Sequence, residues 1–556
     1  MASNMIQRRV KHALAVVAAI VAVQVVRSDV SGVLQAQRVK FFSDDPLTRE
    51  PDTQDASKVQ VMEIGLSSDL LLNLFTKLGD PSTNVKARNI NTIDEVPDSS
   101  WFNNRIYSRD LTVDELTRGA NASEPPASGR WTVIRGKSTG AATGFTARDE
   151  KGQVWFVSFD GRDIPVAPTA AAMVATKLFW ALGYNQVETH LTTMVPENVV
   201  VDPQATLRAH GKRRTLTTDD VEDVFKRSAA SADGSYRAIV GRAVPGYVGH
   251  FRYFGTRPDD PNDVVDHEHR RELRALKVFG AWTNLVDMKA GNTLDALEKN
   301  GSLSVVKHYL QDVGSTFGTG ANAPREDDEG HEYLYQGAPL AKRLFTFGLF
   351  VRPWQKMDYV ENAEIGKFEG TEFEPEDWKP RVPVAALRHA RADDNFWAAL
   401  RVMAFTDDHI RAAVKTGGYT DPAAEKLLAD ILIQRRDKIG KTYLSRINPL
   451  TRFAVSGDAV TFENPAVKAG YATAPKGGYE ATWATFNNGT GEASPIGSPI
   501  TSADERVQLP ASVPGSEQFV KVSIRAVDPP HAPWSTPVNV YLRRAADGWQ
   551  LVGVER

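Results

Sequence analysis

The residues best suited to chemistry in this sequence fall in two short groups. The first reads Asp287-Met-Lys289-Ala-Gly-Asn292, a D-x-K-x-x-N pattern, and about twenty residues later the second reads Asp312-Val-Gly314, a D-x-G pattern. Amide and carboxylate oxygens such as those of Asn292 and Asp312 are hard ligands that suit Mg²⁺. A carboxylate just upstream, at Asp287, can orient a hydroxyl, so the groups together indicate phosphoryl transfer.

A predicted β-hairpin lies between the two groups and would bring them together. Its strands are expected at residues 293–296 and 303–310, with a turn over residues 298–301. The turn contains Asn-Gly, the dipeptide that a type I′ turn requires because both central residues need positive φ. Antiparallel strands lie roughly 5 Å apart, so Asn292 and Asp312 are expected to converge. The alternative is an ordinary surface hairpin.

The spacing resembles the catalytic loop and the metal-binding loop of protein kinases and kinase-like phosphotransferases. By this resemblance Asp287 accepts the substrate proton and Lys289 steadies the transferring phosphoryl group, while Asn292 and Asp312 hold the metal. The resemblance implies Mg²⁺ and ATP as cofactors, and a nucleotide with an unknown protein or small molecule as partners. Leu285-Val286 replaces the family's His-Arg pair, so the chain is more similar to atypical kinases.

A glycine-rich segment precedes this cluster and carries Gly136, Gly140 and Gly144. Backbone amides of such a loop can approach phosphates because glycine has no side chain in the way. Strand, glycine-rich loop, strand, turn and strand is the order of a kinase N-lobe. The spacing is not the kinase G-x-G-x-x-G, and a plain glycine hairpin is the alternative. The expected strands are residues 131–135, 146–149 and 154–159.

The sequence departs from the family at the ion pair that grips the phosphates. Ser158 stands where the third strand should carry lysine, and Met173 where the helix expected over residues 169–182 should carry glutamate. Losing both partners avoids a buried lone charge. Two explanations stay open. Either another cation binds the phosphates, with Lys137 and then Arg148 as candidates, or the protein is a pseudokinase that binds nucleotide weakly or not at all.

Composition excludes several classes of protein. The chain has 556 residues, no cysteine, and 66 Lys and Arg against 69 Asp and Glu, for a net charge of −3. The absence of cysteine excludes disulfides, zinc-thiolate sites and cysteine nucleophiles. No long basic run points to nucleic acid.

The N-terminus carries a pattern that is typical of an export signal. Arg8, Arg9 and Lys11 precede residues 13–26, which are apolar except for Gln24. This is a basic segment followed by an apolar one of signal-peptide length, and it is short for crossing a bilayer. We expect an exported protein, periplasmic or extracellular, with an uncleaved membrane anchor through residues 13–26 as the alternative.

The fold class expected is α+β, with a two-lobed kinase-like body and a C-terminal all-β, sandwich-like domain. A helix over residues 267–286 should deliver Asp287 at its end, and C-terminal strands are expected at 455–462, 479–486, 518–526, 538–543 and 548–554. The predicted parts are an export signal or anchor (1–37), an N-terminal extension (38–128), an N-lobe (129–202), a helical C-lobe with inserts (203–452) and the β domain (453–556). Residues 199–201 are expected to cross between the lobes.

The kinase-like resemblance covers residues 131 to about 450 and is shared with exported bacterial proteins of this type. It implies an ATP-dependent phosphotransferase or a degenerate pseudokinase. Two other functions stay open. One is a non-catalytic envelope protein that binds a partner through residues 453–556, and the other is a metal-dependent hydrolase.

Overall fold

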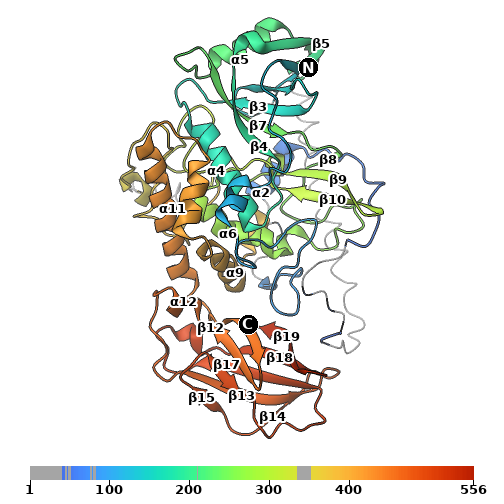
Figure 1. Ribbon diagram of the computed structural model, residues 1–556, viewed down its shortest axis with the longest axis vertical. Coiled ribbons are helices and arrows are strands. Elements are labelled where there is room, and N and C mark those ends of the chain that lie inside the picture. Colours follow the sequence, from blue (N-terminus) through green and yellow to red (C-terminus); the bar gives the residue numbers. More distant parts are fainter. Residues whose placement is uncertain are drawn as a thin grey trace, which may run out of the picture.

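The computed structural model describes residues 40–43, 45, 47, 52–75, 78, 83–138, 140–209, 211–334 and 352–556. The expected export signal over residues 1–37 lies outside this range and stays a prediction. Figure 1 shows a β-sheet at one end of the molecule, a largely helical body in the middle and a β domain at the other end. The expected α+β class is confirmed. Within the described residues, no helix is both long enough and apolar enough to span a bilayer.

The first layer is a seven-stranded sheet with the order β4-β7-β3-β2-β1-β5-β6. Strands β1, β2 and β3 form an antiparallel meander, and β1 pairs with β5 in parallel. Aromatic side chains on one face, including Trp131, Phe145, Trp155 and Phe159, form its core with α5. The elements are β1 (Trp131–Gly136), β2 (Gly144–Arg148), β3 (Val154–Phe159), α4 (Ala167–Leu182), β4 (Thr189–Met194), β5 (Val199–Ala209), β6 (Lys212–Thr215), α5 (Thr218–Arg227) and β7 (Tyr236–Arg242).

Two expectations about this layer are wrong. Residues 199–201 do not cross between lobes, because they begin β5 and pair with β1 at Trp131–Val133. The sheet also extends beyond the expected boundary at residue 202, since β7 lies between β3 and β4. The sheet-bearing part therefore runs to Arg242.

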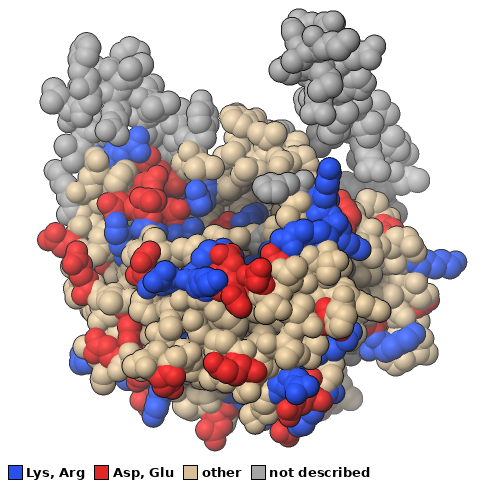
Figure 2. Space-filling view, turned by 90° about the horizontal axis from the view of Figure 1, so that it is seen from above, with Lys and Arg blue, Asp and Glu red and all other residues tan. Residues whose placement is uncertain are grey.

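Figure 2 looks down on this end of the molecule, where basic and acidic side chains are interspersed.

The middle layer combines a small sheet, β10-β9-β8, with helices. Helix α6 begins after a 3₁₀ turn at His267–His269 and ends at Thr283, earlier than expected, because Asn284 adopts the left-handed conformation with φ 55°. The elements are α2 (Leu66–Phe75), α3 (Val113–Arg118), β8 (Tyr247–Gly249), α6 (Arg271–Thr283), β9 (Leu294–Asn300), β10 (Leu303–Tyr309), α8 (Ala385–Arg388), α9 (Ala392–Met403), α10 (Asp407–Lys415) and α11 (Pro422–Tyr443).

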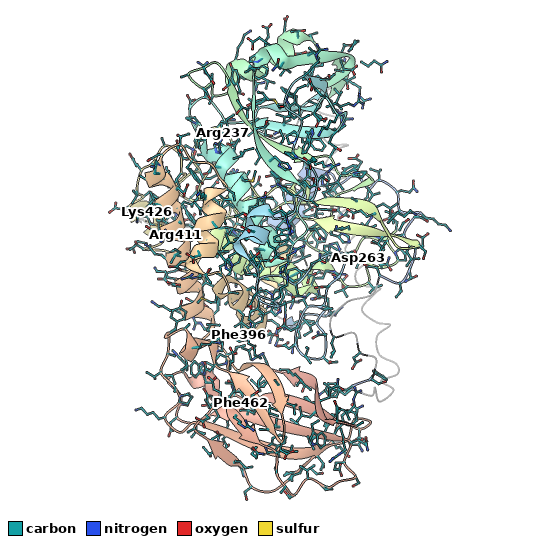
Figure 3. All side chains as sticks on the ribbon, in the orientation of Figure 1. Arg237, Asp263, Phe396, Arg411, Lys426 and Phe462 are labelled. Carbon is teal, nitrogen blue, oxygen red and sulfur yellow. The ribbon has the colours of Figure 1, made fainter. Side chains whose placement is uncertain are left out.

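The C-terminal domain is all-β apart from a single short α-helix and a 3₁₀ turn, and its two sheets are β11-β12-β16 and β14-β13-β17-β18-β19, with β15 pairing β13. Phe462 of the first sheet, labelled in Figure 3, meets Tyr479 of the second with ring centroids 5.1 Å apart. The elements are β11 (Thr451–Ser456), β12 (Ala459–Glu463), α12 (Pro465–Lys468), β13 (Tyr479–Phe486), β14 (Ala493–Pro495), β15 (Ile500–Ser502), β16 (Arg506–Gln508), β17 (Phe519–Ala526), β18 (Val538–Ala545) and β19 (Gly548–Glu555).

A buried charge network joins this domain to the body. Arg556 Nε donates to Asp94 Oδ2 at 3.0 Å, and Arg271 Nη2 on α6 donates to Asp94 Oδ1 at 2.9 Å. Arg271 Nε also donates to Asp394 Oδ1 of α9 at 3.1 Å. The Arg556 guanidinium lies 4.8 Å from the ring centroid of Phe396, which Figure 3 labels beside the β domain. The N-terminal extension, α6, α9 and the β domain thus share one set of buried charges.

Candidate functional site

The hairpin that should bring the two motifs together forms as β9 and β10. Its register runs from Asn300 opposite Leu303 to Leu294 opposite Tyr309. The two-residue loop is therefore Gly301-Ser302, and only Gly301 has positive φ, at 61°. The expected type I′ turn centred on Asn-Gly is wrong by one residue, because glycine takes the first central position, as in a type II′ turn.

The open end of the hairpin gathers the predicted polar residues. Asp312 N donates to the Asn292 carbonyl at 3.0 Å, so the two residues are direct neighbours across the strands. Asn292 Nδ2 donates to the Asp287 carbonyl at 2.6 Å, which fixes the amide and leaves its Oδ1 available to a ligand. Lys289 Nζ lies 2.7 Å from Asp287 Oδ2. All four residues assigned to catalysis and metal binding thus lie in one cluster.

The members of the cluster differ in exposure, which suits their expected roles. Asn292 is buried, the Asp287 side chain is 22% exposed, and Asp312 is exposed. Gly314 N donates to Asp312 Oδ1 at 3.2 Å, and this hydrogen bond does not involve Oδ2. A Cβ on Gly314 would lie 3.2 Å from Ala172 Cβ of α4, so glycine lets this helix approach the D-x-G turn.

Helix α2 supports the catalytic-loop segment from the N-terminal extension. The Asp69 carboxylate, 3% exposed, faces the Ala290 backbone amide, which favours the charged form of the carboxylate. Arg252 Nε lies 3.6 Å from Asp69 Oδ1, yet burial raises the pKa of Asp69. The sequence does not reveal this contact, because about 220 residues separate the two segments and no motif marks Asp69. The only local signal is a single charged residue in a helix that is otherwise uncharged.

Two glycines of the glycine-rich segment lie in strands rather than in the loop. A Cβ on Gly136 would lie 2.6 Å from Leu207 Cδ1, and one on Gly144 would lie 2.1 Å from the Val157 carbonyl oxygen. Close strand packing therefore explains glycine at both positions. Gly140 differs, since it lies in the loop itself with φ 82°.

Lys137 extends from this loop to strand β3. Its Nζ donates to Ser158 Oγ at 3.3 Å, the side chain that stands where a kinase strand would carry lysine. The Lys137 Cε lies 3.5 Å from the place of a Cβ on Gly140, so the lysine folds back over that glycine. Partial burial lowers the pKa of Lys137, and the negative charge of Asp312 opposes this effect. The lysine therefore lies within electrostatic reach of the expected metal ligand.

Arg148 and Met173 do not belong to this cluster. Arg148 lies at the far end of β2, four residues from Gly144 and thus roughly 13 Å along the strand, where it meets Asp202 at 4.0 Å. Met173 is buried in α4. The only charged residue of α4 is Lys177, which is 2% exposed and donates to the Arg118 carbonyl at 2.8 Å. Burial lowers the pKa of Lys177 to about 8.

Helix α4 is held over the site by polar contacts at its first turn. Asp160, at the end of β3, accepts hydrogen bonds from Val166 N at 3.1 Å and from Thr169 N at 2.8 Å. Arg237 of β7, labelled in Figure 3, donates from Nε to Thr169 Oγ1 and from Nη1 to the Gly418 carbonyl, both at 2.7 Å. The sheet, α4 and the loop before α11 are thereby tied together.

The segment that follows Gly314 reaches the glycine-rich loop. Phe317 N donates to the Thr283 carbonyl at 2.8 Å, which anchors the segment to the end of α6. Asn322 Nδ2 then donates to the Ala141 carbonyl at 3.0 Å. Residues 315–334 thus border the site from both sides. Residues 335–351, which continue this segment, lie outside the described residues.

The donor set of the cluster fits a divalent cation that keeps part of its water shell. Within the described residues, no group of three or more His, Asp and Glu side chains could hold a metal alone. The cluster instead offers the Asn292 amide oxygen and the Asp312 carboxylate on adjacent backbones. Mg²⁺ is usually bound by one or two carboxylates together with waters and substrate phosphates, so these oxygens suit it.

Comparison with known proteins finds distant structural neighbours and no match by sequence. No protein-family model matches the chain, and no curated protein matches it. Two crystal structures of the Golgi casein kinase, one of them with Mn/ADP bound, align with 71% of this chain and 94% of theirs. Sequence identity is 13% and the TM-score is 0.28 in both cases.

Proposed function

We propose that the protein is an atypical kinase-like phosphotransferase that uses Mg²⁺ and ATP, with Lys137 replacing the missing strand lysine. The observation that carries this proposal is the contact between Lys137 Nζ and Ser158 Oγ at 3.3 Å, together with the influence of Asp312 on the same ammonium. The Lys137 ammonium thus lies beside Ser158, the strand position at which the sequence lacks the expected lysine. The order of strand, glycine loop, strand, turn, strand and helix observed in β1 to α4 also supports it.

The residues of the cluster divide the reaction between them. Bound Mg²⁺ would neutralise charge on the phosphates, with Asn292 and Asp312 as its protein ligands. Lys137 would pair with phosphate oxygens as a point charge. Asp287 would accept the proton of the attacking hydroxyl, and Lys289, 2.7 Å away, orients the Asp287 carboxylate and can also reach the transferred group.

The absence of a glutamate on α4 is consistent with this arrangement. The negative charge of Asp312 opposes the desolvation of the Lys137 ammonium, so this lysine has a compensating anion on another element. Met173 fills the corresponding position with an apolar side chain in the core of α4. Moving the lysine from the strand to the loop therefore removes the need for the second half of the ion pair.

The experiment measures nucleotide binding and turnover in the full chain. We expect Mg²⁺-ATP to raise the melting temperature with increasing ligand concentration, and Lys137→Met to weaken this response. Lys151→Met, at the exposed β2–β3 turn at the opposite end of the sheet, is the matched control and should bind like the parent protein.

The same assay separates an enzyme from a pseudokinase. Transfer of the γ-phosphoryl group to water or to a protein acceptor, lost in Asp287→Asn, would support the enzyme. Binding without transfer would indicate a pseudokinase. If Mg²⁺-ATP fails to stabilise the parent protein at millimolar concentration, the proposal is wrong.

A further inference from the structure

A cavity of about 800 Å³ lies between the seven-stranded sheet and the β9–β10 hairpin. Its wall includes Gly152 in the β2–β3 turn, residues 243–245 after β7, and Tyr309 of β10. Strand β2 begins at the glycine-rich loop and ends before Gly152. The cavity therefore lies at the opposite end of the sheet from Lys137, and none of its lining residues belongs to the site described above.

Gln186 is an unsatisfied polar residue in this wall. It is 5% exposed, and neither Nε2 nor Oε1 of its amide has a hydrogen-bond partner. Buried polar groups in native proteins are almost always paired, and an unpaired one costs free energy. A bound molecule that presents an acceptor and a donor side by side would satisfy both atoms.

Arg105 is a cation in the same wall. Its Nη1 donates to the carbonyls of Trp180 at 2.6 Å and Tyr184 at 3.2 Å, and its guanidinium lies 4.6 Å from the Trp180 ring centroid. Burial lowers the pKa of Arg105 to about 10, against the opposing charge of Asp98. Within the described part of the chain, no carboxylate forms an ion pair with it.

The other charged side chains of the wall already have partners. Arg242 Nη1 lies 3.1 Å from Glu188 Oε2, and Lys307 Nζ lies 3.3 Å from Glu298 Oε2. Tyr309 donates its hydroxyl proton to Glu298 as well. Each of these pairs is neutral, so Arg105 is the one charged side chain of the described cavity wall without an ion-pair partner.

We propose that this cavity binds a small organic anion whose carboxylate or phosphate pairs with Arg105 and whose neighbouring amide-like edge pairs with Gln186. The volume falls within the range of small-molecule sites, roughly 300–1,000 Å³. Val187 and Val244 supply apolar surface for the rest of the ligand. The proposal does not depend on phosphotransfer, because it uses a different set of residues.

Two probes test the proposal on the full chain. N-acetylglutamate carries carboxylates and an amide, and AMP carries a phosphate and a base edge. At least one of them is expected to raise the melting temperature and to slow hydrogen exchange of residues 184–190 and 242–246, with no change at residues 136–145. The two probes also distinguish a carboxylate amide from a nucleotide as the source of the anion. Protection confined to residues 136–145 would place AMP at the other site and count against the proposal.

Single substitutions locate the ligand. Gln186→Leu should raise the melting temperature of the free protein, because it removes the unpaired amide. The same variant should lower the affinity for the probe on the order of tenfold. Arg105→Gln should weaken it similarly. Gln204→Leu and Arg213→Gln, at exposed positions of β5 and β6, are the matched controls. The proposal is overturned if neither probe protects the wall segments at millimolar concentration, or if both cavity variants bind as the parent does.

Discussion

The two halves of the candidate phosphotransfer site are built in different ways. In the hairpin half, backbone hydrogen bonds set the positions, since Asp312 N bonds to the Asn292 carbonyl and the Asn292 amide bonds to the Asp287 carbonyl. In the sheet half, one long side chain, Lys137, reaches from an exposed loop to a single hydroxyl. Backbone geometry therefore determines the positions of the polar groups in the hairpin half, whereas a single side chain supplies the charge of the sheet half.

This difference shows which half can vary without loss of the fold. A residue held by backbone bonds can be replaced only by one that keeps the same geometry. Under the proposed function, the phosphate-binding cation is supplied from another position, since Lys137 Nζ lies 3.3 Å from Ser158 Oγ. The predictions below test whether the two halves contribute as unequally as their construction indicates.

The largest effect is expected in the hairpin half. Asp312→Asn removes a charged metal ligand while keeping its shape, and should lower the rate of phosphoryl transfer on the order of 10³-fold. Steady-state kinetics over a range of Mg²⁺ concentrations would measure it. Asp110→Asn, on an exposed loop, is the control. Unchanged turnover in Asp312→Asn would remove this half from the site.

The next effect tests the sheet half directly. Lys137→Ser should lower transfer on the order of 10²-fold, because one phosphate-binding charge is lost. The double variant Lys137→Ser/Ser158→Lys returns a lysine to the strand position and should recover about tenfold of that loss. Initial rates of the two variants provide the comparison. No recovery would show that the loop position itself is essential.

A third effect concerns Lys177 in α4, which borders both halves. Its folded pKa of about 8 lies below the ordinary lysine value of 10.5, so between these values the unfolded chain binds the proton and the folded chain does not. Stability should therefore rise with pH from about 8 to 10.5, by about 3 kcal/mol in all. Urea unfolding across this window would show it, and Lys177→Met should flatten the rise. A parent protein with no such rise would contradict this.

The smallest effect separates two glycines of the same segment. Gly144→Ala places a Cβ against the Val157 carbonyl oxygen at 2.1 Å and should destabilise the fold by about 2 kcal/mol. Gly140→Ala meets only Lys137 at 3.5 Å and should cost about 1 kcal/mol for its positive φ. Thermal unfolding of the pair measures the difference. Equal losses would mean that the loop is as constrained as the strand.

The sequence predicts the local elements well and their distant contacts poorly. The expected strand at residues 154–159 forms as β3 with the same bounds, and the helix expected over residues 169–182 forms as α4, which begins two residues earlier and ends at Leu182 as expected. Periodicity and turn residues carry this information. The strand expected over residues 455–462 is instead a hairpin, β11 and β12, because Gly457 turns with φ 61°.

The same division applies to the candidate site. The motif spacing predicts the gathering of Asp287, Asn292 and Asp312, because a single hairpin determines it. It does not reveal that Asp69 supports Ala290, or that Arg148 lies at the wrong end of β2, because both depend on how separate elements pack. Which of Lys137 and Arg148 lies near the hairpin cluster is therefore set by the packing of separate elements.

The buried contacts of Arg556 have a consequence for how the molecule unfolds. Asp94 accepts hydrogen bonds from Arg556 and Arg271, so releasing the β domain would strip a buried carboxylate of one of its two arginine partners. The domain and the body should then melt in a single calorimetric transition, and the β domain excised alone should be less soluble than the whole. Because the two parts share these contacts, a substitution that destabilises the end of the β domain should also destabilise the helical body.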